Sequence, residues 1–270
     1  MRVALVSDVF YSEDGESRLR RRLAEAKARG ATLAVLPEIP LNPWSPATAT
    51  PRDEDAEAAN GPRHQMLGRC AQEGRIAVVG GAIVLDPSTG KRHNTALVFD
   101  DAGNLVGTYR KVHLPNEEGF REPCHYDPGS DPPQAIQAGG LTFGVQICSD
   151  MNRPAGSQVL GAAGAQAIVN PRATQAITYE RWKLVFRANA LTSTAYVLSV
   201  NRPGPEQGVD IGGPSIAVDP NGDVLIESMD PVTTVDLDEQ VITNARRRYP
   251  GYLAHFPAIY ARGWSQVNPR

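Results

Sequence analysis

The stretch Leu141–Asp150 reads LTFGVQICSD, and it guides the interpretation of the rest of the chain. Apolar residues alternate with small or polar ones, and β-branched and aromatic side chains are frequent, so the pattern predicts a strand. The strand delivers Cys148 at its carboxyl end. In α/β proteins, ligands bind at the carboxyl ends of strands. We therefore expect Cys148 to be a nucleophile, although most free cysteines are simply small buried apolar residues.

Like Cys148, two charged residues lie at the ends of expected strands. Glu38 follows the strand expected at Ala31–Leu36, and Lys111 follows the strand expected at Asn104–Arg110. Either residue alone would be read as a surface charge. Together with a thiol they supply a base, an electrostatic stabiliser and a nucleophile, each at a strand end. The sequence therefore predicts a catalytic set of Glu38, Lys111 and Cys148.

Composition limits the classes of function. A chain of 270 residues with a net charge of −3 suits a soluble enzyme and gives no indication of a nucleic-acid or anionic-membrane partner. The sequence shows neither a signal peptide nor an apolar run long enough to span a membrane. Three cysteines without CxxC spacing favour a reducing cytoplasm with free thiols. The five histidines form no HExxH or paired spacing, so we expect no metal site.

Strands and helices alternate along the whole chain, with no repeat and no clear linker. We expect one α/β domain over residues 1–270, ending in an irregular tail from about residue 249. Many of the strands are joined as hairpins, which predicts sheets with both parallel and antiparallel neighbours packed between helices. The segment Asn42–Asn60 is rich in proline and alanine and is expected to be a long surface loop beside Glu38. Helices are expected at Ser17–Arg29, Pro62–Gln72, Ser157–Ala163, Glu180–Thr192 and Glu239–Arg248.

Three motifs in order resemble the nitrilase, or carbon–nitrogen hydrolase, superfamily. They are Leu36-Pro37-Glu38, the segment YRKVHLP at Tyr109–Pro115, and the segment GVQICSD at Gly144–Asp150. The family carries a second glutamate ahead of a Pro-Gly pair, and Glu122 takes that place. Each motif is modest alone, but the ordered set is specific. The resemblance covers roughly residues 3–237 and implies a four-layer α-β-β-α sandwich.

The resemblance also implies a mechanism that needs no cofactor. Glu38 takes the proton of Cys148, and Lys111 balances the charge and donates to the oxyanion, with the backbone N–H of Ser149 as second donor. Glu122 orients Lys111 and the substrate amide nitrogen. Ammonia or an amine leaves, and water then hydrolyses the thioester. The implied activity is hydrolysis of the C–N bond of a small linear amide or N-carbamoyl compound.

The residues directly after the cysteine indicate the substrate class. Nitrile-hydrolysing branches carry Cys-Trp-Glu there, whereas this chain has Cys148-Ser149-Asp150, which favours an amidase or N-carbamoyl amidohydrolase. The alternatives are a nitrilase and a non-catalytic binding protein on the same fold. Arg172 follows the next strand, and two interpretations stay open: it binds a substrate carboxylate, or it pairs with a loop carboxylate.

The family assembles as homodimers or larger homo-oligomers. The apolar face of Glu180–Thr192 and the aromatic residues of the tail fit a partner surface, although those aromatics would equally suit covering the core of their own subunit.

Overall fold

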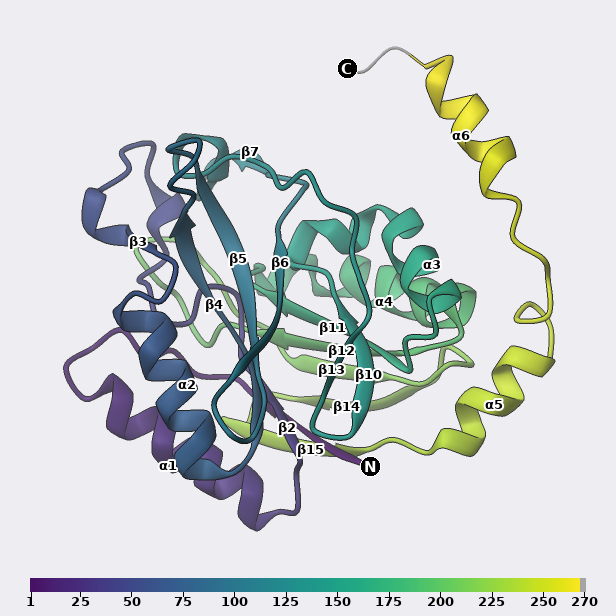
Figure 1. Cartoon of the computed structure of the whole chain (residues 1–270), viewed down its shortest axis with the longest axis horizontal. Coiled ribbons are helices and arrows are strands. Elements are labelled where there is room, and N and C mark those ends of the chain that lie inside the picture. The colour runs from purple at the N-terminus through teal and green to yellow at the C-terminus, as the bar shows by residue number, and fades with distance from the viewer. Residues whose placement is uncertain (268–270) are drawn as a thin grey trace.

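The computed structural model describes residues 1–267 and is built around two mixed sheets (Figure 1). The first sheet contains both parallel and antiparallel pairings along its main path, and a short strand, β3 (Ala56–Ala58), pairs with β4 off that path. Its order is β15 (Val232–Asp236), β1 (Arg2–Val6), β2 (Leu33–Val35), β4 (Ala77–Leu85), β5 (Arg92–Phe99) and β6 (Leu105–Arg110).

The second sheet is formed by the other half of the chain. Strands β10, β11 and β12 run parallel, and antiparallel hairpins extend the sheet at both edges. Its order is β14 (Val224–Ser228), β13 (Ser215–Val218), β12 (Tyr196–Asn201), β11 (Ala167–Arg172), β10 (Leu141–Val145) and β9 (Ile136–Ala138). A separate two-stranded ribbon consists of β7 (Asn116–Glu117) and β8 (Phe120–Arg121).

Three apolar layers hold the elements together. The central layer joins the two sheets, with Val3 and Leu33 from the first facing Phe143 and Leu198 from the second. The outer face of the first sheet packs on α1 (Gly15–Ala28) and α2 (Pro62–Gly74). The outer face of the second packs on α3 (Pro154–Ala162) and α4 (Tyr179–Ser193). The expected four-layer α-β-β-α sandwich is confirmed (Figure 1).

The cysteine strand is shorter than its sequence pattern suggests. β10 ends at Val145, and Cys148 begins a 3-10 turn, η4 (Cys148–Asn152). The alternation of apolar residues continues to Ile147, but the Ile147 N–H donates to the side chain of Asp150 instead of to a neighbouring strand. The chain therefore leaves the sheet before it reaches the thiol.

The segment Asn42–Asn60 is less of a surface loop than expected. Asn42 and Trp44 are fully buried, and Trp44 packs edge-on against Phe120 of the two-stranded ribbon. The Trp44 indole donates to the carbonyl oxygen of Gly119, 2.8 Å away. This segment therefore forms a wall beside Glu38.

The tail from residue 249 is not irregular, because it contains a helix, α6 (Pro257–Ser265), after α5 (Glu239–Arg247). Pro257 at the first helical position is a typical helix start. The sequence did not predict α6 because its aromatic residues do not follow the apolar periodicity of a helix with one buried face. Figure 1 shows α6 standing apart from the sandwich. Every residue from Tyr252 to Val267 is exposed, with Trp264 at 71%, so the tail aromatics do not cover the core of their own subunit.

Among residues 1–267, no helix is both long and apolar enough to cross a membrane.

Candidate active site

The structure places an ammonium group between two carboxylates in the interior. Nζ of Lys111 lies 2.7 Å from Oε1 of Glu38 and 2.6 Å from Oε1 of Glu122, and all three side chains are fully buried. Glu38 lies just after β2, Lys111 directly follows β6, and Glu122 begins a short turn after β8. Residues from separate parts of the chain thus meet where the strands end. The sequence predicted strand-end positions for Glu38 and Lys111, whereas Glu122 was expected here from the family resemblance.

Cys148 adjoins this group. Its side chain is 3% exposed, and its Sγ lies 3.7 Å from the carbonyl oxygen of Ala173. Burial, followed by the charge of Glu38, raises the pKa of the Cys148 thiol above its ordinary value, and Lys111 opposes this shift. The resting thiol is therefore protonated and needs a nearby base before it can attack a carbonyl.

The two carboxylates cannot both carry full charge at low cost. Burial raises the pKa of Glu122 to about 8; Lys111 opposes the shift, whereas Glu38 adds to it. Burial lowers the pKa of Lys111, but the charges of Glu122 and Glu38 outweigh it and raise that pKa above its ordinary value. Burial thus favours the protonated form of Glu122 more than in a solvent-exposed glutamate, and the ammonium group of Lys111 works against this.

Each of these two carboxylates has a second oxygen that makes no hydrogen bond with the described residues. Oε2 of Glu38 and Oε2 of Glu122 are buried and accept no hydrogen bond from the described residues. Asn94 on β5 donates to Oε1 of Glu38 at 2.8 Å, which fixes the orientation of that carboxylate. Buried polar atoms without partners cost free energy, so their presence beside a thiol indicates a place for a polar ligand.

Asp150 joins the Cys148 turn to the Lys111 segment. Its Oδ1 accepts from the N–H of His113 at 2.9 Å and from Nδ1 of the same residue at 2.8 Å. Its Oδ2 accepts from the Tyr109 hydroxyl at 2.9 Å and from the Ile147 N–H at 3.2 Å. One buried carboxylate therefore connects the end of β6 with the end of β10, and His113 braces the loop after Lys111.

Arg202 holds the Glu38 segment from the opposite sheet. It follows β12, and its Nη1 donates to the carbonyl oxygens of Glu38 at 2.8 Å and of Ile39 at 2.9 Å. Its charge is paired with Glu206 at 2.6 Å. Ile39 has a φ of 36°, which is unfavourable for a β-branched residue. The buried guanidinium therefore stabilises a strained turn directly after the candidate base.

Cys148 is the second strained position, with a φ of 45°. Strained residues of this kind concentrate at functional sites, where the surrounding contacts compensate for their cost. The next residue, Ser149, lies at the amino end of η4, where the first N–H groups of a helical turn lack partners within the turn. The Ser149 hydroxyl donates to the carbonyl oxygen of His113.

Arg172 is the last residue of β11 and is completely buried. Its guanidinium donates to the hydroxyls of Ser199 and Thr174 and to the carbonyl oxygen of Pro214, and it lies over the rings of Tyr179 and Phe186 at 5.9 and 5.5 Å. None of the described residues gives it a carboxylate partner. Burial lowers the pKa of Arg172 to about 10, so the group still carries its charge at neutral pH.

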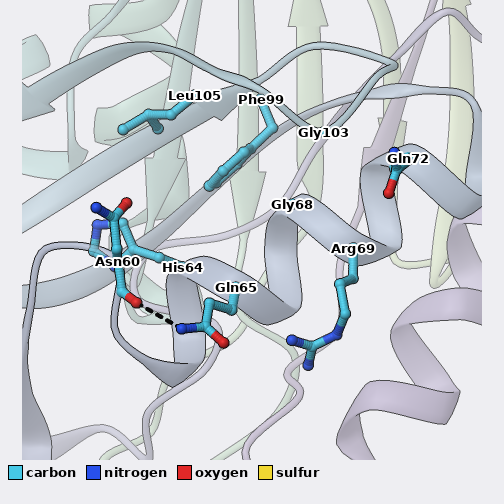
Figure 2. A pocket seen from close by; sticks show the side chains of 9 residues that line it. All are labelled: Asn60, His64, Gln65, Gly68, Arg69, Gln72, Phe99, Gly103 and Leu105. Atoms are coloured by element: carbon cyan, nitrogen blue, oxygen red, sulfur yellow. Dashed lines mark hydrogen bonds between the residues drawn. The ribbon is translucent and has the colours of Figure 1, made fainter.

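The structure also contains a separate cavity of about 460 Å³ (Figure 2). It lies between α2 and the hairpin of β5 and β6, and its wall includes His64, Arg69 and Phe99. None of the residues expected to be catalytic lines it. The candidate active site lies elsewhere, and its side chains are buried, with Cys148 3% exposed.

The contacts that Asp150 and Arg202 make were not predicted from the sequence, and neither was the burial of Tyr126. Asp150 lies within the cysteine motif, but several of its partners are distant in sequence: the N–H groups of Val112 and His113, the Tyr109 hydroxyl and Nδ1 of His113. Arg202 directly follows a predicted strand, and this strand-end position could have indicated a place near the site. Tyr126 lies four residues after Glu122 as an aromatic side chain within a polar loop, and it is buried.

The chain is similar to known proteins over most of its length. The family model described as carbon-nitrogen hydrolase matches residues 13–247. The omega-amidase NIT3 of Saccharomyces cerevisiae is 30% identical over 272 residues, covering 93% of this chain and 91% of that protein. The crystal structure of yeast Nit3, a member of branch 10 of the nitrilase superfamily, superposes with a TM-score of 0.77 over 93% of this chain and 94% of the other.

A carbon-nitrogen hydrolase from Helicobacter pylori has the same fold. Its crystal structure superposes with a TM-score of 0.86 at 20% identity, covering 99% of each chain. At that identity the similarity concerns the fold alone.

Replacing Asp150 by asparagine tests whether this carboxylate joins the two strand ends. The asparagine side chain would present an amide N–H₂ to backbone N–H donors and lose acceptors in a buried place. We expect Asp150→Asn to lower the free energy of unfolding by about 2–4 kcal/mol and to reduce turnover, as measured by denaturant unfolding and a rate assay. Asp101→Asn, in an exposed turn, is the matched control. Equal stability of the two variants would contradict the role given to Asp150.

Proposed function

The chain belongs to the carbon-nitrogen hydrolase family, and from that premise we propose that it hydrolyses a small linear amide through a thioester on Cys148. The observation that carries the proposal is the buried ammonium of Lys111, held by Glu38 and Glu122 next to the only thiol at the strand ends among the described residues. Such a cluster supplies a base, a cation and a nucleophile without solvent.

Acylation proceeds by proton transfer within the cluster. Glu38 takes the proton from Sγ of Cys148, the sulfur bonds to the amide carbon, and the carbonyl electrons move onto oxygen. Lys111 and the backbone N–H of Ser149 stabilise that oxyanion. The C–N bond then breaks with its electron pair on nitrogen, which takes the proton from Glu38 and leaves as ammonia or an amine. Glu122 holds Lys111 and the amide nitrogen in position.

Deacylation uses the same groups in reverse. Glu38 takes a proton from a water molecule as its oxygen bonds to the thioester carbon. The C–S bond then breaks, and the proton returns from Glu38 to sulfur, which restores the thiol and releases the carboxylic acid. No group outside the cluster gains or loses a proton over the full cycle.

The surroundings of Arg172 favour a substrate that carries a carboxylate remote from the scissile bond. Each guanidinium nitrogen of Arg172 makes one hydrogen bond, so each of the two terminal nitrogens retains an N–H. A buried cation without an anionic partner is costly, and a substrate carboxylate would supply that partner. The omega-amidase relatives are in keeping with an amide rather than a nitrile substrate.

We further propose that the chain works as a homodimer or larger homo-oligomer in the cytoplasm. The outer face of α4 exposes Leu184 at 67%, and α6 exposes Tyr260 and Trp264 away from the body of the subunit (Figure 1). A second copy would remove this apolar surface from water. Three free cysteines, one of them the candidate nucleophile, suit a reducing compartment.

Cys148→Ala tests the nucleophile. We expect it to abolish ammonia release from every amide while circular dichroism and the melting temperature stay close to the wild type, because a methyl group replaces a small thiol. Cys70→Ala is the control: Cys70 is also buried, and burial raises the pKa of its thiol to about 11, but it lies on α2. Residual hydrolysis by a folded Cys148→Ala protein would reject the thioester route. A nitrile of the same acid, assayed in parallel, separates amidase from nitrilase activity.

Arg172→Ala tests the substrate class. We expect it to raise the Michaelis constant for amides with a remote carboxylate by the equivalent of about 1–3 kcal/mol, the value of a hydrogen bond to a charged group. Neutral amides should be hydrolysed almost as by the wild type, and they also report whether the variant is folded. An equal loss on both kinds of amide would show that Arg172 only supports β11.

A further inference from the structure

Asn170 carries a buried amide that has no role in the proposed reaction. It lies on β11, directly after Val169, where the backbone pairing of β11 with β10 ends. Its Nδ2 donates to the carbonyl oxygen of Gln146 at 2.7 Å and to that of Cys148 at 3.3 Å. The residue is completely buried. A side-chain amide thus replaces the backbone ladder at the place where the chain leaves the sheet toward Cys148.

The partners of Asn170 allow one orientation of its amide. Its two carbonyl partners can only accept, so Nδ2 must face them, and both of its hydrogens are used. Oδ1 then faces the hydroxyl of Ser199 on β12, which donates to it at 2.8 Å. The Ser199 oxygen in turn accepts from Nε of Arg172 at 2.8 Å. All three residues are completely buried, so the amide is fixed between the cysteine turn and β12.

The carbonyl group of Cys148 and the N–H of Ser149 belong to one peptide unit. This unit is trans, so it is planar and its C=O and N–H point in opposite directions. The hydrogen bond that holds the Cys148 oxygen toward β11 therefore aims the Ser149 N–H away from β11. That N–H donates to none of the residues from 1 to 267, which leaves it available to a ligand.

This peptide unit needs support from outside the turn. Cys148 has a φ of 45°, a conformation that residues with a Cβ rarely adopt, and the surrounding contacts must compensate for its cost. The Asn170 amide supplies one of these contacts at the carbonyl group itself. A hydrogen bond to a carbonyl group also polarises its peptide unit and strengthens the N–H at the other end as a donor. The amide therefore both directs and strengthens the Ser149 N–H.

We propose that Asn170 is a positioning residue for the oxyanion: through the Cys148–Ser149 peptide, its amide aims the Ser149 N–H at the oxygen that becomes negative when the thiol attacks. The inference rests on the proposed function, in which this N–H is the second oxyanion donor. Loss of one such donor costs about 10²–10³ in kcat. Poorer aim of the same donor costs part of that factor, and the cost falls on kcat because the charge develops only in the transition state.

Asn170→Asp tests this role, with a neutral primary amide as substrate. The variant keeps the shape of the side chain and an acceptor for Ser199, but it no longer presents an N–H₂ group to the two carbonyl oxygens. We expect kcat to fall about tenfold or more while KM stays within about threefold of the wild type.

Alkylation of Cys148 by iodoacetamide provides the second readout, because it displaces iodide and forms no oxyanion. Its rate in Asn170→Asp should stay within about threefold of the wild type. Mass spectrometry of the peptide that contains Cys148 measures this rate, since Cys124 is exposed and also reacts.

Asn189→Asp is the matched control. Asn189 is also buried, and its Nδ2 donates to the carbonyl oxygens of Met151, in the same turn η4, and of Val185, each at 2.9 Å. Its replacement removes the same kind of hydrogen bonds without touching the Cys148–Ser149 peptide. Both variants should lose stability, but Asn189→Asp should keep kcat within about threefold of the wild type. Asn170→Ala and Asn189→Ala, which bury no charge, repeat the comparison if an aspartate variant does not fold.

The outcomes separate this inference from the proposed function. If the wild type hydrolyses the amide and a folded Asn170 variant loses less than about tenfold in kcat, or no more than its Asn189 counterpart, the role of Asn170 is overturned and the proposed function stands. Equal losses of hydrolysis and alkylation, or failure of both Asn170 variants to fold, show a structural residue and also overturn the inference. A wild type that hydrolyses no amide overturns both.

Discussion

The hydrogen bonds from Nζ of Lys111 to Glu38 and Glu122 are the constraint on which the site depends. Removing three ionisable groups from water costs several kcal/mol for each ion, and only close pairing compensates for that cost. Burial raises the pKa of Glu122 to about 8; Lys111 opposes this shift, and the charge of Glu38 adds to it. The same burial brings a carboxylate, an ammonium group and a thiol together away from solvent, so the electrostatic cost of the cluster and its proposed chemistry have one origin.

Contacts between the two sheets hold the residues of this cluster in place. Glu38 and Lys111 follow strands of the first sheet, whereas Cys148 follows a strand of the second. Two buried groups cross between the sheets: Asp150 joins the Cys148 turn to the Lys111 segment, and Arg202 fixes the backbone after Glu38. Backbone strain at Ile39 and Cys148 marks the two places where these contacts hold the chain in an unfavourable conformation.

The sequence was most informative where chemistry and local pattern coincide. β6 has the predicted carboxyl end at Arg110. The residues singled out by ordered motifs meet in space because β2 and β6 run in the same direction and end at one edge of the first sheet, and the Cys148 turn of the second sheet adjoins that edge. The early end of β10 was hidden, since alternation continues past Val145 and does not reveal that the Ile147 N–H donates to the side chain of Asp150, three residues later. α6 was missed because its aromatics face outward, and Tyr126 because an unpartnered hydroxyl is recognised only in three dimensions.

The most direct test of the account is a double-mutant cycle on Glu38 and Lys111, measured as kcat/KM for amide hydrolysis. Glu38→Gln and Lys111→Met each remove a charge from a cluster that acts as one unit. The account predicts that each single variant is nearly inactive and that the double variant is scarcely worse than either, so that the losses do not add. Losses that add in the double variant would contradict it, because the two residues would then act at separate places.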